Sequence, residues 1–160
     1  MKVKDGIKIV GRLRITVRDA KTNEVLKVIE KENVITTQGL QLILDKLAED
    51  TTGGPGSQTG ITHLWVGDGT TAASQADTDL TNFLSEAEVG DYYRSGLTAT
   101  FSTFFSTSEA NHTWAEVGLA NGPHGSGILI TRSVFGANSF TKSDTQTVTV
   151  DYDITISGGG

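Results

Sequence analysis

The stretch IKIVGRLRITVRDAKTNEVLKVIEKENVI, residues 7–35, decides the fold class of this chain. In its first part Leu13, Ile15 and Val17 alternate with polar residues, and this two-residue period is typical of a β-strand with one buried face. The letters DAKTN that follow are turn formers, and a second run rich in apolar residues comes after them. The stretch therefore predicts a β-hairpin over residues 7–29.

The apolar period changes after the hairpin. In QGLQLILDKLAED the leucines and the isoleucine recur at helical spacing, which predicts a short amphipathic helix near residues 38–49, and Thr36 or Thr37 can cap its first turn. The polar stretch TTGGPGSQTG, residues 51–60, ends this helix. Its length and composition suit a segment that is mobile or is ordered only by a neighbouring subunit.

Strand patterns dominate the rest of the chain. They fall in ITHLWVG, YYRSGLTATFSTFFS, HTWAEVGLANG, GILITRSVFG and TQTVTVDYDITISG. We therefore expect a mainly β protein, an antiparallel β-sandwich or small barrel with an N-terminal β-hairpin arm (residues 1–32), a β-rich body (residues 33–160) and one or two short helices. Trp65 and Trp114 lie within strand patterns and are predicted to anchor the core.

Composition narrows the function classes. The 160 residues suit one domain, and the absence of cysteine excludes disulfides, thiolate metal sites and cysteine nucleophiles. No apolar run reaches the length of a membrane span, and the charged N-terminal segment does not resemble a signal peptide. We expect a soluble protein, made inside the cell, that has no membrane partner.

The charges are divided unevenly between the two parts of the chain. Residues 1–50 contain 10 basic and 8 acidic residues (net +2), whereas residues 51–160 contain 3 basic and 11 acidic residues (net −8). The hairpin could dock on an acidic partner, or it could be a solvated hairpin whose charges only alternate with core residues. The candidate partner contacts of the arm are Lys8, Arg12, Arg14 and Arg18. Nucleic acid is not an expected partner, because the basic residues lack interleaved aromatics.

The segment VGDGTTAASQADTDL, residues 66–80, could be a phosphate loop, a metal site or a turn. It lacks the lysine of a P-loop, and its aspartates do not have the spacing of an EF-hand. We therefore predict a structural turn of Gly67, Asp68 and Gly69 in which Asp68 and Gly69 adopt unusual backbone angles. Asp77 and Asp79 are then expected to flank Thr78 at the start of a short helix, DTDLTNFLSEAE, where acidic residues complement the helix dipole.

The remaining polar residues show no arrangement typical of catalysis. His63, His112 and His124 lack the spacing of a zinc pair, and Ser126 in HGSGI does not lie in a G-x-S-x-G motif. The sequence therefore predicts a protein that is not an enzyme and that has no metal and no cofactor.

The order of several short motifs resembles that of a diffuse family of tailed-bacteriophage virion proteins. The motifs are Asn-Val-(x)-Thr-(x)-x-Gly before a helix, a Val-Gly-x-Gly-Thr turn, an Asp-Thr-x-Leu element and a later Glu-x-Gly-Leu strand. They match at Asn33, Val34, Gly39, Val66, Gly67, Gly69, Thr70, Asp77, Thr78, Leu80, Glu116, Gly118 and Leu119. The resemblance covers roughly residues 30–157.

This resemblance implies a non-enzymatic, β-rich structural protein of the virion, in which Asp77 and Thr78 cap the segment after the Gly-Asp-Gly turn. A capsid decoration protein that cements the head lattice is the first expectation, with the major capsid protein or other virion proteins as partners and a homo-oligomer, a trimer in the first instance. A tail, tail-fibre adaptor or baseplate component is the second expectation. A carbohydrate-binding module that uses Tyr92 and Tyr93 is the third.

Overall fold

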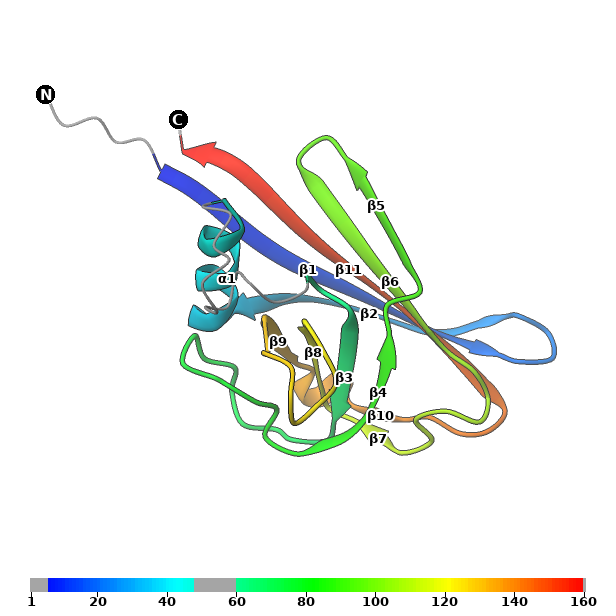
Figure 1. The fold of residues 1–160 in the computed structure, drawn as a ribbon. Coiled ribbons are helices and arrows are strands. Elements are labelled where there is room, and N and C mark those ends of the chain that lie inside the picture. Colours follow the sequence, from blue (N-terminus) through cyan, green and yellow to red (C-terminus); the bar gives the residue numbers. More distant parts are fainter. Residues whose placement is uncertain (1–5, 48–59, 160) are drawn as a thin grey trace, which may run out of the picture.

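The computed structural model describes residues 6–47 and 60–159 (Figure 1), and it is mainly β, as the sequence predicts. The elements in chain order are β1 (Gly6–Asp19), β2 (Val25–Ile35), α1 (Thr37–Leu47), β3 (His63–Gly67), β4 (Phe83–Glu88), β5 (Asp91–Ser95), β6 (Thr98–Phe105), β7 (Thr113–Trp114), β8 (Glu116–Ala120), β9 (Thr131–Val134), the 3-10 helix η2 (Gly136–Asn138), β10 (Phe140–Thr141) and β11 (Gln146–Gly159).

The predicted hairpin is confirmed as β1 and β2, and Asn23 takes a positive φ of 59° in the turn between them. Strand β1 also pairs antiparallel with β11 along its whole length, from Gly6 opposite Gly159 to Asp19 opposite Gln146. Both edges of β1 are therefore hydrogen-bonded within the sheet. The described part of the expected arm, residues 6–32, belongs to the centre of the sheet and is not a segment apart from the body.

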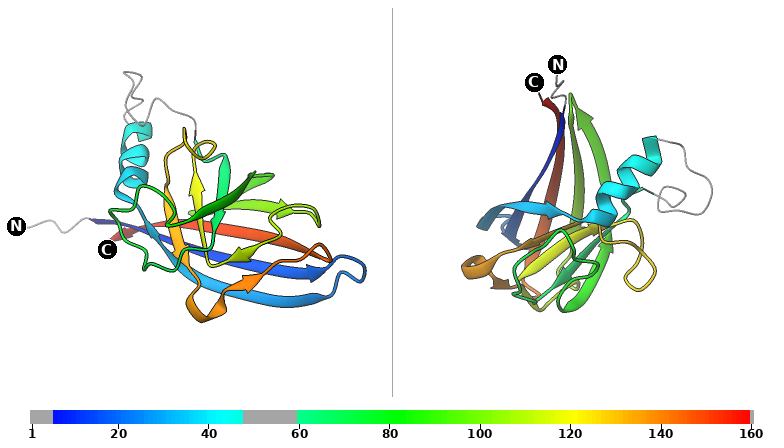
Figure 2. Two further views of the ribbon diagram at one scale, coloured as in Figure 1. Left: turned by 90° about the horizontal axis from the view of Figure 1, so that it is seen from below. Right: turned by 90° about the vertical axis from the view of Figure 1, so that its left-hand side faces the viewer.

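Nine strands form one antiparallel sheet in the order β4-β3-β8-β9-β2-β1-β11-β6-β5, and β7 pairs separately with β10. The sheet is strongly curled into a half-barrel (Figure 2). Its two outermost strands, β4 and β5, are joined in the chain only by Val89 and Gly90. The Gly90 N–H donates to the carbonyl of Ser102 on β6. This short link keeps the two edges of the sheet close together.

The concave side of the half-barrel contains the main core. Alternate residues of β1 and β11, such as Leu13, Ile15, Val150 and Tyr152, are almost fully buried there, and burial raises the pKa of Tyr152. Both tryptophans are buried, as predicted. Trp114 packs edge-on against Phe105 in the main core, whereas Trp65 belongs to a smaller cluster with Leu80 and Leu129.

The helix is also confirmed, and Thr36 is its capping residue. The Thr36 hydroxyl accepts the Gly39 N–H at 3.0 Å and donates to the Leu129 carbonyl, which ties the start of α1 to the segment before β9. Of the following stretch, residues 51–60, only Gly60 belongs to the part of the chain that the structure describes, so the expectation of mobility lies outside it.

The run YYRSGLTATFSTFFS forms a hairpin and not one strand. Strands β5 and β6 pair around Gly96 and Leu97, and Gly96 has a φ of +58°, which a residue without a side chain adopts readily. A continuous strand was expected because the apolar alternation passes through this turn: Leu97 fits the pattern but is exposed at the tip.

Candidate functional site: the apolar end of the half-barrel

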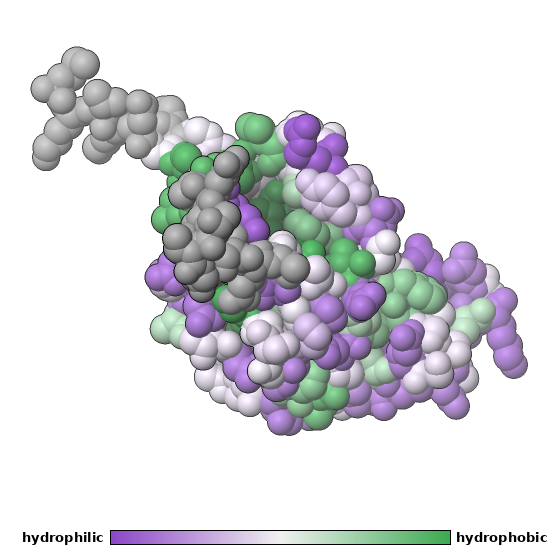
Figure 3. Space-filling view, in the orientation of Figure 1, coloured by the Kyte–Doolittle hydropathy of each residue, from purple (hydrophilic) through white to green (hydrophobic). Residues whose placement is uncertain are grey.

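An apolar groove of about 370 Å³ opens between α1 and the inner face of β6 and β11. Its walls include Leu42 and Ile43 from α1, Ala99 and Phe101 from β6, and Ile154 and Ile156 from β11. Figure 3 shows apolar side chains around a hollow on this face of the molecule. Arg94 is the one charged side chain among the described residues that line the groove.

Several large apolar side chains are exposed on the elements that form this groove. Leu47 on α1 is 74% exposed and Leu97 at the hairpin tip is 68% exposed, while Leu44 and Ile156 are exposed to a lesser degree. We call the groove together with Leu44, Leu47, Leu97 and Ile156 the apolar end. Exposed apolar side chains of this kind beside a groove are typical of a surface that contacts a partner.

The helical period of α1 explains part of this surface. The apolar stripe predicted from the sequence includes Leu44 and Leu47, and a stripe of this kind is normally buried against the core. In the structure only Gly39 and Leu42 of α1 are buried. The stripe is therefore real, but within the described residues it is largely uncovered.

The arginines proposed as partner contacts lie on a different surface, the convex face of the sheet. Two cross-strand rows lie there, Glu32-Arg12-Asp153-Thr100-Tyr93 and Glu30-Arg14-Asp151-Ser102-Asp91. We call these two rows the polar ladder. Arg12 lies 3.6 Å from Glu32, Arg14 lies 3.8 Å from Glu30, and both pairs are exposed.

The polar ladder does not form a basic patch. Each of its two arginines stands between carboxylates on both neighbouring strands, and the rows contain five acidic residues in all. The other two candidates lie elsewhere on β1: Lys8 is exposed opposite Ser157, and Arg18 is half-buried opposite Thr147. The structure therefore does not bring the four basic residues together into one positively charged surface.

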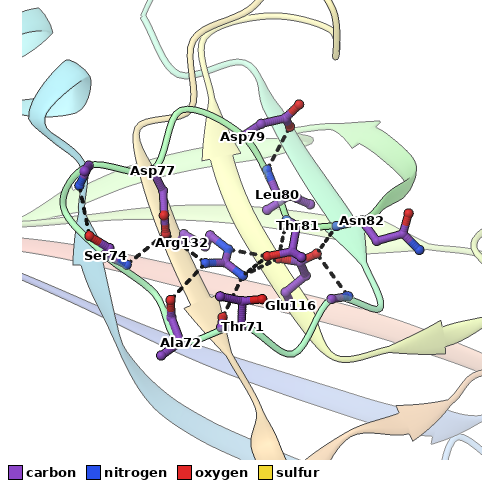
Figure 4. Close-up of polar contacts among 12 residues, drawn as sticks. Thr71, Ala72, Ser74, Asp77, Asp79, Leu80, Thr81, Asn82, Glu116 and Arg132 are labelled. Carbon is purple, nitrogen blue, oxygen red and sulfur yellow. Dashed lines mark hydrogen bonds and ion pairs between the residues drawn. The ribbon is translucent and has the colours of Figure 1, made fainter.

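The segment after β3 is held by a buried ionic network (Figure 4). The Glu116 carboxylate on β8 is fully buried and accepts backbone N–H groups of Gly69, Thr81 and Asn82 at 2.8–3.0 Å. Arg132 on β9 is 1% exposed and donates Nε–H to Glu116 at 2.8 Å. We call Glu116, Arg132 and Asp77 the clamp.

Arg132 connects the clamp to the rest of the segment. Its Nη1 donates to Asp77 Oδ2 at 2.8 Å, and its Nη2 donates to the carbonyl of Thr71 and to the hydroxyl of Thr81. A buried arginine needs this complete set of acceptors because an unpaired charge in the interior is costly. The segment is thus a structural element held to the sheet.

The backbone of the turn differs from the conformation predicted for it. Asp68 and Gly69 are not among the residues with positive φ, so the expectation of unusual angles is wrong. Glycine is needed for space instead: a Cβ on Gly69 would lie 2.3 Å from Glu116 Oε1, and one on Gly67 would lie 2.3 Å from the Asn82 carbonyl oxygen. The two glycines leave room for the buried carboxylate.

The predicted helix after Asp77 is also wrong. The segment Phe83–Glu88 is strand β4, paired with β3, and Thr78 is exposed. Asp77 accepts the Ser74 N–H and the Arg132 guanidinium, so its carboxylate serves the clamp and does not cap a helix. Pairing with the buried strand β3 overrides the local signal of acidic residues.

The histidines serve separate local contacts. His124 stacks on Phe83 at 3.8 Å between ring centroids, and its Nε2 lies 2.9 Å from Asp79. His112 Nε2 lies 2.7 Å from the hydroxyl of Ser85. No group of three His, Asp or Glu residues in the described ranges is arranged to hold a metal ion.

Sequence reasoning missed Arg132 and the groove. The signal for the clamp was a single charge inside each of two apolar runs, AEVGLA and ILITRSV, because a charge in a buried strand requires a partner of opposite sign. The groove had no comparable signal, since its walls come from segments far apart in the sequence.

Comparison with known proteins gives no relative: no family model matches the chain, and neither a curated protein nor a solved structure matches it significantly. Within the described residues, no helix is both long and apolar enough to cross a membrane.

Proposed function

We propose that this chain is a non-enzymatic structural protein of a tailed-phage virion, and that it is a capsid decoration protein that binds the head lattice through its apolar end. The observation that carries the proposal is the uncovered apolar stripe of α1 beside the groove. Exposed apolar area of this kind is stabilised when a partner removes it from water. The virion setting itself comes from the order of the sequence motifs.

The polar features of the chain support a structural role. The segment with the most motif-like sequence, residues 66–80, is held by the clamp, and the clamp leaves its charged groups paired with each other. The polar ladder pairs opposite charges across neighbouring strands. Docking is therefore assigned to the apolar end, in place of a basic arm.

Repetition on a lattice makes a modest contact sufficient. Each copy adds a small interface, and many copies bound to neighbouring coat subunits hold the shell at many points. The partner in this proposal is the major capsid protein, and the location is the virion.

The carbohydrate-binding alternative is weakened by strand geometry. Tyr92 and Tyr93 are adjacent on β5, so their side chains point to opposite faces of the sheet and do not form one aromatic platform. Tyr92 packs toward Phe101, with ring centroids 5.2 Å apart, whereas Tyr93 lies on the polar ladder.

The test of location is the copy number of this protein relative to the major coat protein in purified particles. A ratio near one, or a simple lattice fraction such as one third, supports decoration of the whole shell. A few copies per particle would place the protein in the tail or baseplate and overturn the decoration proposal. Absence from particles would overturn the virion role.

The test of the surface uses a matched pair of leucines. Leu97→Asp places a charge at the apolar end, whereas Leu84→Asp places one on β4, where Leu84 is also exposed. We expect Leu97→Asp to abolish binding to particles that lack the protein, with Leu84→Asp binding like the parent chain. Equal binding by both variants would exclude the apolar end as the docking surface.

A further inference from the structure

Strand β5 is an outer edge of the nine-stranded sheet. It pairs with β6 on one side, and no described strand pairs with its other side. All five of its residues, DYYRS from Asp91 to Ser95, are exposed. An open edge of this kind offers backbone hydrogen bonds to another extended strand.

The hairpin fixes which backbone groups face outward. Ser95 and Thr98 flank the two-residue turn, so Ser95, Tyr93 and Asp91 exchange hydrogen bonds with β6, while Tyr92 and Arg94 direct their N–H and C=O groups away from it. One contact agrees with this alternation: the Tyr92 N–H donates to the side chain of Asp91, its own neighbour, at 2.8 Å.

We propose that a second copy of this chain pairs antiparallel with β5, about a two-fold axis that passes between the two Tyr93 residues. The outward groups of Tyr92 then bond with those of Arg94 in the partner copy, and the reciprocal pair forms by symmetry. This register pairs every outward group of Tyr92 and Arg94. The two sheets join into one continuous sheet.

The side chains in this register are complementary. A two-fold axis normal to the sheet keeps each face continuous, so the side chains of directly opposed residues lie on the same face. Tyr92 then faces the Arg94 guanidinium of the partner copy, an arrangement that favours cation–π attraction, and it does so twice. A shift that places the axis at Arg94 would oppose two guanidinium groups.

The polar face is complementary as well. The two Tyr93 rings meet at the axis beside the polar ladder, and Asp91 lies opposite the uncharged Ser95 of the second copy. Tyrosine is enriched in the centres of protein interfaces because it combines apolar area with a hydroxyl. The pairing is two-fold, and it replaces the trimer expected from the sequence.

Asp91 opposes this association in the free chain. Its carboxylate occupies the Tyr92 N–H that the partner strand needs, so pairing must displace it. Native proteins protect sheet edges with charged residues in this way. The side chain of Asp91 therefore limits pairing to conditions of high local protein concentration, such as a capsid lattice. The role of the lattice rests on the proposed function, whereas the strand pairing does not.

The absence of cysteine in the chain permits a clean test. Tyr93→Cys places two thiols at the axis, in a non-hydrogen-bonded pair whose Cα atoms are about 4.5 Å apart. Ser95→Cys places them on the same face, but four residues out of register and roughly 13 Å apart. Under mild oxidation we expect a covalent dimer from Tyr93→Cys and at least tenfold less from Ser95→Cys.

Analytical sedimentation of two further variants, which contain no cysteine, provides the second measurement. Asp91→Ala frees the edge and is expected to lower the dimer dissociation constant at least fivefold, while Arg94→Pro, which removes an outward N–H, is expected to raise it by a similar factor. Equal crosslinking of the two cysteine variants, or a trimer without a Tyr93 crosslink, would overturn the pairing. Particle binding by Leu97→Asp is read separately, so each proposal can fail alone.

Discussion

The segment after β3 and the apolar end differ in how their side chains are satisfied. Around the segment, a carboxylate and a guanidinium buried from water have a full set of partners within the chain. At the apolar end, leucines and isoleucines face solvent beside a groove. The difference indicates that the motif-rich segment preserves the fold, while the surface without a motif is available to a partner.

The largest expected effect comes from breaking the clamp. Arg132→Met leaves the Glu116 carboxylate buried without its counter-charge, and we expect the free energy of unfolding to fall by about 3–5 kcal/mol. Urea denaturation measures the change. The control is Arg14→Met on the exposed polar ladder, where the expected loss is at most about 1 kcal/mol. Similar losses for both variants would remove the distinction between the two regions.

A smaller effect is expected from crowding the same carboxylate. Gly69→Ala needs no change of backbone conformation, but its methyl group would collide with Glu116 and Thr81, so we expect a loss of about 1–3 kcal/mol. Gly90→Ala is the control, because the nearest atom to its Cβ is 3.9 Å away. Thermal melting compares the two, and an unchanged melting temperature for Gly69→Ala would mean that the segment can move away from β8.

At the apolar end we expect little change in stability. Leu44→Gln removes apolar area that is already exposed, so the free energy of unfolding should stay within about 0.5 kcal/mol of the parent. Binding to particles should weaken in the same variant, as measured by cosedimentation. A large loss of stability would show that Leu44 belongs to the core of this chain, and the contrast between the regions would then fail.

The carboxylate of Asp19 lies outside both regions and allows a prediction of how stability changes in acid. Backbone N–H groups of Thr22 and Lys21 lower the pKa of Asp19 from its ordinary value of 3.8. Because its folded pKa lies below the unfolded one, Asp19 stabilises the fold above about pH 3.8, and this contribution is lost as the pH falls through the folded pKa. Denaturation of Asp19→Asn should therefore approach that of the parent in acid, and a gap that widens in acid would contradict this.

Local patterns predicted the parts of the fold in which burial follows one strong period. Leu13, Ile15 and Val17 gave the first strand, and the leucines of α1 gave the helix. Local patterns mislead where pairing with a distant strand determines the structure. The acidic start of DTDLTNFLSEAE favours a helix, but the end of this segment is strand β4, which pairs with β3 at the edge of the sheet. The apolar period also could not show that the stripe of α1 stays exposed, because that depends on what packs against the helix.

The site was less predictable than the fold. Gly67, Gly69 and Asp77 were recognised as structural, but their roles could not be derived because the group they accommodate, the Glu116 carboxylate, is more than 30 residues away and needs Arg132 on another strand. The groove requires α1, β6 and β11 to meet, and nothing in a local pattern specifies that meeting.

The pairing of β1 with β11 has a consequence for how the protein forms. The central ladder joins residues about 140 positions apart in the chain, from Gly6 opposite Gly159 onward. Strand β11 must therefore be synthesised before β1 can pair with it, and until then this edge of β1 lacks its partner strand. Such a high contact order predicts slow, late folding, and the nascent chain has most to gain from a chaperone in that interval.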